Sequence, residues 1–327
     1  GMKNKMKKHI LILAVLLFIS CADKSTPKQT VQQVKANAIE ETAIVVLGNV
    51  QDAGSPQIAC KKECCADLFE HPDSQRRVVS LGLVDAEHHK SYMFEATPDI
   101  AQQMKMLTQF NAKGTIEVVN GIFLTHAHIG HYTGLMYLGK EAMDARETPV
   151  YVMPKMEDFL LNNGPWDQLV KRKNVQLHKM VEQVAIQLSD KISVTPIVVP
   201  HRDEYSETVG YHIKGPNKSA LFIPDIDKWD NWDKNIIEEI QKVDFAFLDA
   251  TFYSGKEINN RDIGEIPHPF VIESLEKFKG LTDMEKSKIV FIHFNHTNPL
   301  LNPESEESKF VLEQGFKIGR LNDVFKL

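Results

Sequence analysis

The sequence has 327 residues and a formal net charge of -6; 43% of its residues are hydrophobic and 25% are charged. This composition is ordinary for a soluble globular protein. The net charge gives no basic footprint for a nucleic acid, so we expect a small-molecule substrate and no nucleic-acid partner.

The first 42 residues have the layout of an export signal followed by a polar tether. Four lysines between positions 3 and 8 precede an apolar run at residues 10–19, which is too short to span a bilayer as an ordinary transmembrane helix. Residues 17–21 resemble a bacterial lipobox that ends at Cys21, the residue that would be lipidated. A plain secretory signal with an incidental cysteine is the alternative.

We therefore expect three segments. Residues 1–21 would direct export and attach the protein to a bacterial membrane through a lipid on Cys21, facing outside the cytoplasm. Residues 22–42 lack apolar periodicity and predict a flexible tether. Residues 43–327 would fold as one domain, since α/β folds of this size exist as single units.

Strands and helices are predicted along the whole domain. Apolar and β-branched runs predict strands at residues 43–47, 78–84, 91–95, 115–124, 150–153, 175–179, 184–188, 192–199, 209–213, 220–223, 243–248 and 289–292. Helices are predicted at residues 97–110, from Gly134, and at residues 157–161, 230–241 and 269–278. The first of these would start with Thr97 as the N-cap and Pro98 in the first turn.

Metal-capable side chains follow several of these strands. They are His126, His128 and His131 after the strand that ends at Thr125, and then His201, Asp225 and His293 after three later strands. Side chains at the ends of neighbouring strands converge on one site, and imidazole is the commonest metal ligand in proteins. A histidine-rich site with one bridging aspartate suits zinc, with manganese or iron as less specific choices. We expect one or two ions there.

A second group of ligands lies in the loop after the first strand, where Cys60, Cys64 and Cys65 are clustered. In an exported protein these thiols could form a disulfide. They could also bind a structural zinc ion with a nearby histidine such as His71. The adjacent Cys64 and Cys65 are not expected to face one ion easily, and both alternatives stay open.

The spaced ligands resemble those of the metallo-β-lactamase superfamily, whose signature after a strand is His-x-His-x-Asp-His. Residues 126–131 match it except that Gly130 stands in place of the aspartate. Segments 54–57, 95–99, 248–252 and 293–299 resemble the pyrroloquinoline quinone biosynthesis protein B branch. That branch is similar to cyclic-phosphate phosphodiesterases and to tRNA 3′-processing nucleases. The resemblance covers about residues 43–320 and implies an α/β fold, a four-layer αβ/βα sandwich with the metals at one edge.

The resemblance also implies the ligand sets. His126, His128 and His201 would hold the first metal, whereas His131, Asp225 and His293 would serve the second, with Asp225 bridging both. Gly130 offers no ligand atom, so we expect the second ion to be weakly bound or absent. Relatives hold a structural zinc in a Cys-x-Cys-x-x-Cys pattern, in which Lys62 of this chain replaces the middle cysteine.

The function implied is that of an exported metal-dependent hydrolase of a phosphodiester or another ester, acting through a metal-activated water. Asp225 would position the metals, His268 or His296 would protonate the leaving group, and Asp249 would orient a ligating histidine. The alternatives are a non-hydrolytic iron oxygenase or cofactor-maturation protein of the quinone-biosynthesis B type, and a degenerate metal-binding module.

Overall fold

A computed structural model describes residues 39–111, 117–202, 204–259 and 261–327, which belong to one compact unit. The predicted export signal with Cys21, and most of the predicted tether, lie outside the described residues. Among the helices that are described, none combines the length and the apolar composition needed to cross a bilayer.

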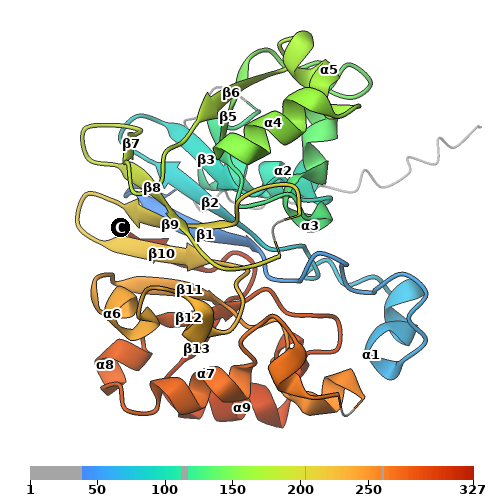
Figure 1. Cartoon of the computed structure of the whole chain (residues 1–327), viewed down its shortest axis with the longest axis vertical. Helices are drawn as coiled ribbons and strands as arrows, with labels where there is room; N and C mark the ends of the chain where they lie inside the picture. Colours follow the sequence, from blue (N-terminus) through green and yellow to red (C-terminus); the bar gives the residue numbers. More distant parts are fainter. Residues whose placement is uncertain (1–38, 112–116, 203, 260) are drawn as a thin grey trace, which may run out of the picture. The chain divides into compact units, whose positions relative to one another are not determined.

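Two mixed sheets lie at the centre of this unit (Figure 1). The first is built from β1 (Ala43–Gly48), β2 (Ser80–Asp85), β3 (Lys90–Phe94), β4 (Gly121–Phe123), β5 (Thr148–Val152), β6 (Val175–Lys179) and β14 (Val324–Lys326). The second is built from β7 (Ile186–Gln187), β8 (Ser193–Val198), β9 (Val209–Lys214), β10 (Ser219–Ile223), β11 (Phe245–Asp249), β12 (Ile289–Ile292) and β13 (Lys317–Ile318). Their strand orders are β14-β1-β2-β3-β4-β5-β6 and β13-β12-β11-β10-β9-β8-β7.

Strand direction decides where the strand ends meet. Strands β10, β11 and β12 are mutually parallel, and β8 runs the same way because both β8 and β10 pair antiparallel with β9. In the first sheet, β3 and β4 are parallel as well. The carboxyl ends of β8, β10, β11 and β12 therefore lie at one edge of the second sheet, as the ligand pattern of the sequence requires.

Helices cover the outer face of each sheet. The first sheet packs against α2 (Ile100–Phe110), α4 (Pro154–Asn162) and α5 (Trp166–Lys171). The second packs against α6 (Ile236–Gln241), α7 (Val271–Phe278) and α9 (Glu306–Glu313), and the short α8 (Asp283–Lys286) precedes β12. The two sheets share a third apolar core between them. The predicted four-layer αβ/βα sandwich is therefore confirmed.

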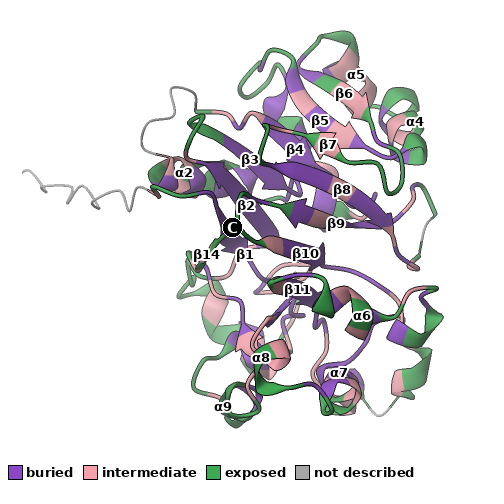
Figure 2. Ribbon diagram, turned by 90° about the vertical axis from the view of Figure 1, so that its left-hand side faces the viewer, coloured by how far each residue is buried: buried purple, intermediate pink, exposed green. Residues whose placement is uncertain are grey.

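Aromatic rings from both sheets fill the central core. The ring of Phe94 lies 5.1 Å from that of Phe123 in the same sheet, and 5.4 Å and 5.9 Å from those of Tyr211 and Phe222 in the other. Phe222 pairs in register with Tyr211 and Phe247. Figure 2 shows buried residues concentrated in the strands and exposed residues on the outer helices. This core fixes the sheets relative to each other.

Several boundaries differ from the sequence prediction. Helix α2 begins at Ile100 rather than near Thr97, because the Thr97 hydroxyl accepts a hydrogen bond from the backbone N–H of Asp99 (3.0 Å) and forms a turn before the helix. The helix predicted from Gly134 starts earlier, as α3 (Ile129–Tyr132), and continues as a 3-10 helix. The helix predicted at 230–241 is reduced to α6, which Asn235 caps.

Replacing Phe222 tests the central core. Phe222→Ala should lower the free energy of unfolding by about 3–5 kcal/mol, because a fully buried ring would leave a cavity between the sheets. Phe310→Ala is the matched control, since Phe310 is 46% exposed on α9; its cost should be less than about 1 kcal/mol. Urea-induced unfolding at constant metal concentration measures both, and equal losses would contradict this assignment of the core.

Candidate metal centre

The first group of donors joins four ligands that the sequence predicted. His126, His128, His201 and Asp225 each offer an atom within 4.8 Å of the others. His126 Nε2 lies 2.9 Å from His128 Nδ1 and 3.4 Å from Asp225 Oδ2. His201 Nε2 lies 3.3 Å from Asp225 Oδ1. These side chains come from the ends of β4, β8 and β10.

The second group shares Asp225 with the first. It contains His131, His293, Asp225 and also Asp52, which the sequence analysis did not select. His131 Nε2 and His293 Nε2 each lie 3.7 Å from Asp225 Oδ2. They lie 2.8 Å and 3.1 Å from Asp52 Oδ1. The three side chains expected at this site are thus joined by a second carboxylate, which the loop after β1 brings in.

A hydrogen bond on the far side of the ring fixes the tautomer of His293. The hydroxyl of Thr251 donates to Asp249 Oδ1 (2.6 Å), so its oxygen accepts from His293 Nδ1 (2.8 Å). His131 Nδ1 lies 3.2 Å from the buried carboxylate of Glu95. The Nδ1 proton of His293 therefore points away from the pocket, and its Nε2 lone pair faces oxygens of Asp52 and Asp225. Lone pairs facing one another repel unless a cation lies between them.

Unsatisfied atoms also favour a cation. Within the described residues, His201 Nε2 and Asp225 Oδ1 are buried without a hydrogen-bond partner, although buried polar atoms nearly always have one. His293 and Glu95 have positive φ angles of 66° and 80°, a strained conformation for such side chains. The donor set of imidazoles and carboxylates fits one or two divalent ions.

The charge states of this pocket suit metal binding. Burial opposes ionisation of Asp225, but the charges of His201, His293 and His268 hold its pKa well below the usual range. Burial and the neighbouring His131 lower the pKa of His126 well below its ordinary value. At neutral pH the carboxylate is thus ionised and the imidazole of His126 is neutral, which are the forms that bind metals.

Glu95 and Asp52 raise the pKa of His131. Burial lowers the pKa of the His131 imidazole, but these two carboxylates outweigh it and raise that pKa well above the ordinary value. In the absence of an ion His131 therefore holds a proton. A divalent ion takes the place of such a proton, so metal binding here should release protons.

His268 lies at the rim of the same pocket. Its Nδ1 lies 2.9 Å from Asp249 Oδ2 and 3.2 Å from Asp225 Oδ1. Burial lowers its pKa, but Asp249 and Asp225 together raise it to about 10. The predicted role of Asp249 as an orienting group agrees with these contacts, since it also accepts from Thr251, the partner of His293.

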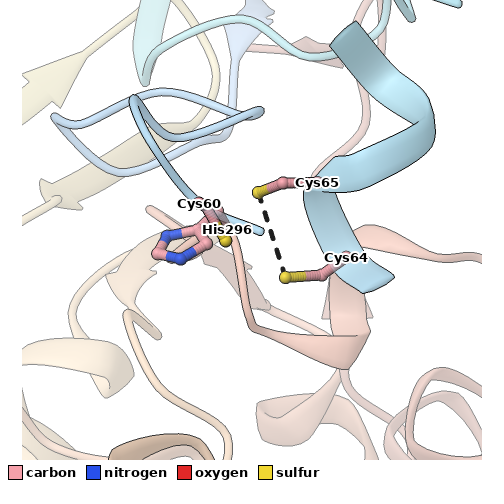
Figure 3. A group of neighbouring side chains, drawn as sticks. All are labelled: Cys60, Cys64, Cys65 and His296. Atoms are coloured by element: carbon pink, nitrogen blue, oxygen red, sulfur yellow. Dashed lines mark hydrogen bonds between the residues drawn. The ribbon is translucent and has the colours of Figure 1, made fainter. Parts of the chain in front are cut away.

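His296 lies elsewhere, which corrects its predicted role as a proton donor. Its ring lies beside Cys60, Cys64 and Cys65 (Figure 3), and each of the four offers a ligand atom within 4.8 Å of the others. His296 Nδ1 is buried without a hydrogen-bond partner among the described residues. The three thiols are free. The structure therefore contains a Cys3His donor set and not the disulfide alternative.

The adjacent cysteines face the same space after all. Helix α1 (Glu63–Ala66) turns Cys64 so that its sulfur lies 3.9 Å from that of Cys65. Cys64 thus supplies the thiol that Lys62 cannot. Burial and the two neighbouring thiols raise the pKa of Cys64 to about 12, so the cluster resists full ionisation without a cation. Zinc prefers such a set of thiolates and one imidazole.

Comparison with known proteins identifies the family of this chain. The family described as the beta-lactamase superfamily domain matches residues 91–294. The chain belongs to the metallo-β-lactamase superfamily.

Relatives within this superfamily agree with the predicted branch. Coenzyme PQQ synthesis protein B of Acinetobacter baylyi is 25% identical over 289 residues, which are 81% of this chain and 93% of that protein. The protein of the same name from Methylorubrum extorquens strain PA1 is 23% identical over 305 residues, covering 84% and 96%. The resemblance to this branch of the metallo-β-lactamase superfamily is therefore confirmed.

Solved structures of metallo-β-lactamase proteins share the fold. Zinc-bound PqqB from Methylobacterium extorquens aligns with a TM-score of 0.69 at 22% identity, over 87% of this chain and 100% of that one. A diphosphatase of the PhnP family aligns with a TM-score of 0.61 at 21% identity, over 88% and 97%. At these identities the likeness shows the fold alone.

Replacing one thiol tests the Cys3His site. Cys60→Ser should remove about one zinc ion per chain and lower the thermal unfolding midpoint, because a structural zinc contributes folding free energy directly. His71→Ala should keep both values, since the His71 ring is 74% exposed and contacts Asp67 instead of the thiols. Elemental analysis and thermal melts measure these effects, and unchanged zinc in Cys60→Ser would rule out the site.

Proposed function

We propose that this protein is a hydrolase of phosphodiesters or related phosphoric esters that works with zinc or manganese. The observation that carries the proposal is Asp225, a buried carboxylate shared by three groups of metal-capable side chains: the two described above and one with Asp249 and His268. Superfamily membership supports hydrolysis, and a diphosphatase of the PhnP family with this fold is the precedent for the phosphoryl substrate proposed here. Fold alone does not choose a substrate.

Bound divalent ions would supply an activated water with a pKa lowered to about 7 and would polarise a phosphoryl oxygen. His126, His128 and His201 would hold one ion, and His131 and His293 the other. Asp225 lies between the two groups and would fix their spacing. Thr251 holds His293 in the tautomer that turns Nε2 toward the pocket, and Glu95 lies 3.2 Å from His131 Nδ1 on the far side of that ring.

His268 is the side chain best placed to protonate the leaving oxygen. Asp249 and Asp225 lie 2.9 Å and 3.2 Å from its Nδ1, and in the metal-free protein their charges outweigh burial and raise its pKa to about 10. With Nδ1 engaged, the proton on Nε2 is the one that can be transferred. His296 has no part in this step, because it lies with the cysteines.

A second candidate function comes from the named relatives. Several proteins that match this chain are coenzyme PQQ synthesis protein B. A role of that type, as an iron oxygenase or a cofactor-maturation protein, would use the same imidazoles and carboxylates with iron. Iron that co-purifies with the protein, together with oxygen consumption, would favour it over hydrolysis.

A reconstitution experiment tests the hydrolase proposal. The apo-protein would be loaded with zinc, manganese or ferrous iron and assayed on chromogenic phosphodiester, phosphomonoester, lactam and lactone substrates and on a diphosphate. We expect turnover of the phosphodiester or the diphosphate with zinc or manganese, and none with chelator. His201→Ala should lower the rate by more than about 100-fold, whereas His88→Ala, in the turn between β2 and β3, should not. No turnover of any phosphoric ester would refute the proposal.

His268→Asn should lower the rate to different extents on substrates with poor and with good leaving groups. A general acid contributes about 10²- to 10⁴-fold when the leaving oxygen is a poor leaving group. The rate of the variant should therefore fall by that factor on an alkyl phosphodiester. The rate on a p-nitrophenyl phosphodiester should fall much less, because that leaving group needs little protonation. Its metal content should stay at the wild-type value. An equal loss on both substrates would show that His268 acts by another route.

A further inference from the structure

We infer that Asp52 is a ligand of the second metal, and that Gly130 leaves the space in which its carboxylate sits. The inference rests on the metal-dependent function proposed above and extends it to the ligand set. It concerns a residue outside the histidine-rich segment, from the loop that follows β1. It also reverses the expectation that Gly130 weakens the second site.

The Asp52 carboxylate points at the second group of donors. Oδ1 lies 2.8 Å from His131 Nε2 and 3.1 Å from His293 Nε2. Asp225 completes the set, and the four ligand atoms lie within 4.8 Å of one another. The Asp52 side chain is only 11% exposed. Two imidazoles and two carboxylates converging in a buried space form a ligand set for a divalent ion.

Gly130 and Asp52 compete for one volume. A Cβ atom built on Gly130 would lie 2.5 Å from Asp52 Cα, 2.8 Å from its Cβ and 2.9 Å from its Cγ. Contacts below 3.0 Å do not occur for real Cβ atoms. A side chain at position 130 would therefore start where the Asp52 side chain runs. One of the two positions can supply a carboxylate, and in this chain it is position 52.

The same backbone contacts hold Asp52 and His293. Val50 forms parallel bridges with Val78 and with Phe294. The backbone N–H of Phe294 donates to Asn49 (2.7 Å), and that of Gln51 donates back to Phe294 (2.8 Å). Asp52 and His293 thus each lie next to a residue of this pairing. A ligand held by paired backbone is preorganised, so little entropy is lost when the ion binds.

Counting bound ions tests the inference without relying on turnover. Asp52→Ala and the isosteric Asp52→Asn would be loaded with zinc and measured by elemental analysis after removal of free metal. We expect both to hold about one ion per chain fewer than wild type. Asp67→Ala is the matched control, because the Asp67 side chain is 80% exposed and its carboxylate pairs with His71. Metal content equal to wild type in both Asp52 variants would overturn the inference.

Cobalt substitution shows which site has lost its ion. Thiolate-to-cobalt charge-transfer bands report the Cys3His site and should be unchanged in Asp52→Asn, whereas the weaker bands of a histidine and carboxylate site should decrease. Loss of the thiolate bands instead would mean that the variant disturbs the cysteine loop, and would overturn the inference.

The reverse substitution gives a second measurement. Gly130→Asp should bind fewer ions than wild type, since the new side chain would clash with Asp52 Cα. Adding Asp52→Gly to that variant should not restore the lost ions, because the clash with Cα at position 52 remains. A gain of metal in Gly130→Asp would contradict the shared-volume argument. If the wild type binds its ions but hydrolyses none of the substrates, the proposed function fails while the result on Asp52 stands.

Discussion

A buried carboxylate dictates much of this architecture. Asp225 is 3% exposed and lies where a charge is costly unless it is paired. Histidines from the ends of β4, β8 and β12 meet it because β8, β10 and β12 run in one direction and the two sheets pack face to face over an aromatic core. Shifting any of these strands by one residue would turn its terminal ligand away from the shared centre.

The same two segments of the chain carry side chains of both the metal pocket and the cysteine cluster. One loop carries Asp52 at its start and Cys60 at its end, and the segment after β12 carries both His293 and His296. Two chain segments thus each contribute a ligand atom to both sites. A zinc ion bound by the cysteine cluster would therefore also hold the loop that carries Asp52.

Much of the site could be predicted from the sequence because its ligands follow strands. His126, His201 and His293 come directly after runs of apolar residues, so their position at a sheet edge follows from the strand pattern. The apolar runs predicted most of the strands, and the resemblance to the superfamily implied the sandwich. Helix boundaries were less accurate, since local hydrogen bonds such as that of Thr97 decide where a helix begins.

Asp52 and the imidazole of His296 beside the cysteines could not be predicted in this way. Asp52 reaches the pocket only through the backbone pairing with Phe294, a contact between distant segments that leaves no local pattern. Glu95 is an acid at the end of a buried strand, and that signal could have identified it. His296 is three residues from His293 in sequence, but the turn between them sends the two rings to different sites.

The position of Asp52 has a consequence for how relatives are recognised. Its carboxylate meets His131 across a sequence separation of 79 residues, so the pocket contains a second carboxylate although the linear signature has a glycine at position 130. A search that requires an acid inside the histidine signature would discard this chain as defective. Superfamily members should therefore be judged by the carboxylates that reach the pocket in three dimensions, and chains with this glycine deserve inspection of the loop after the first strand.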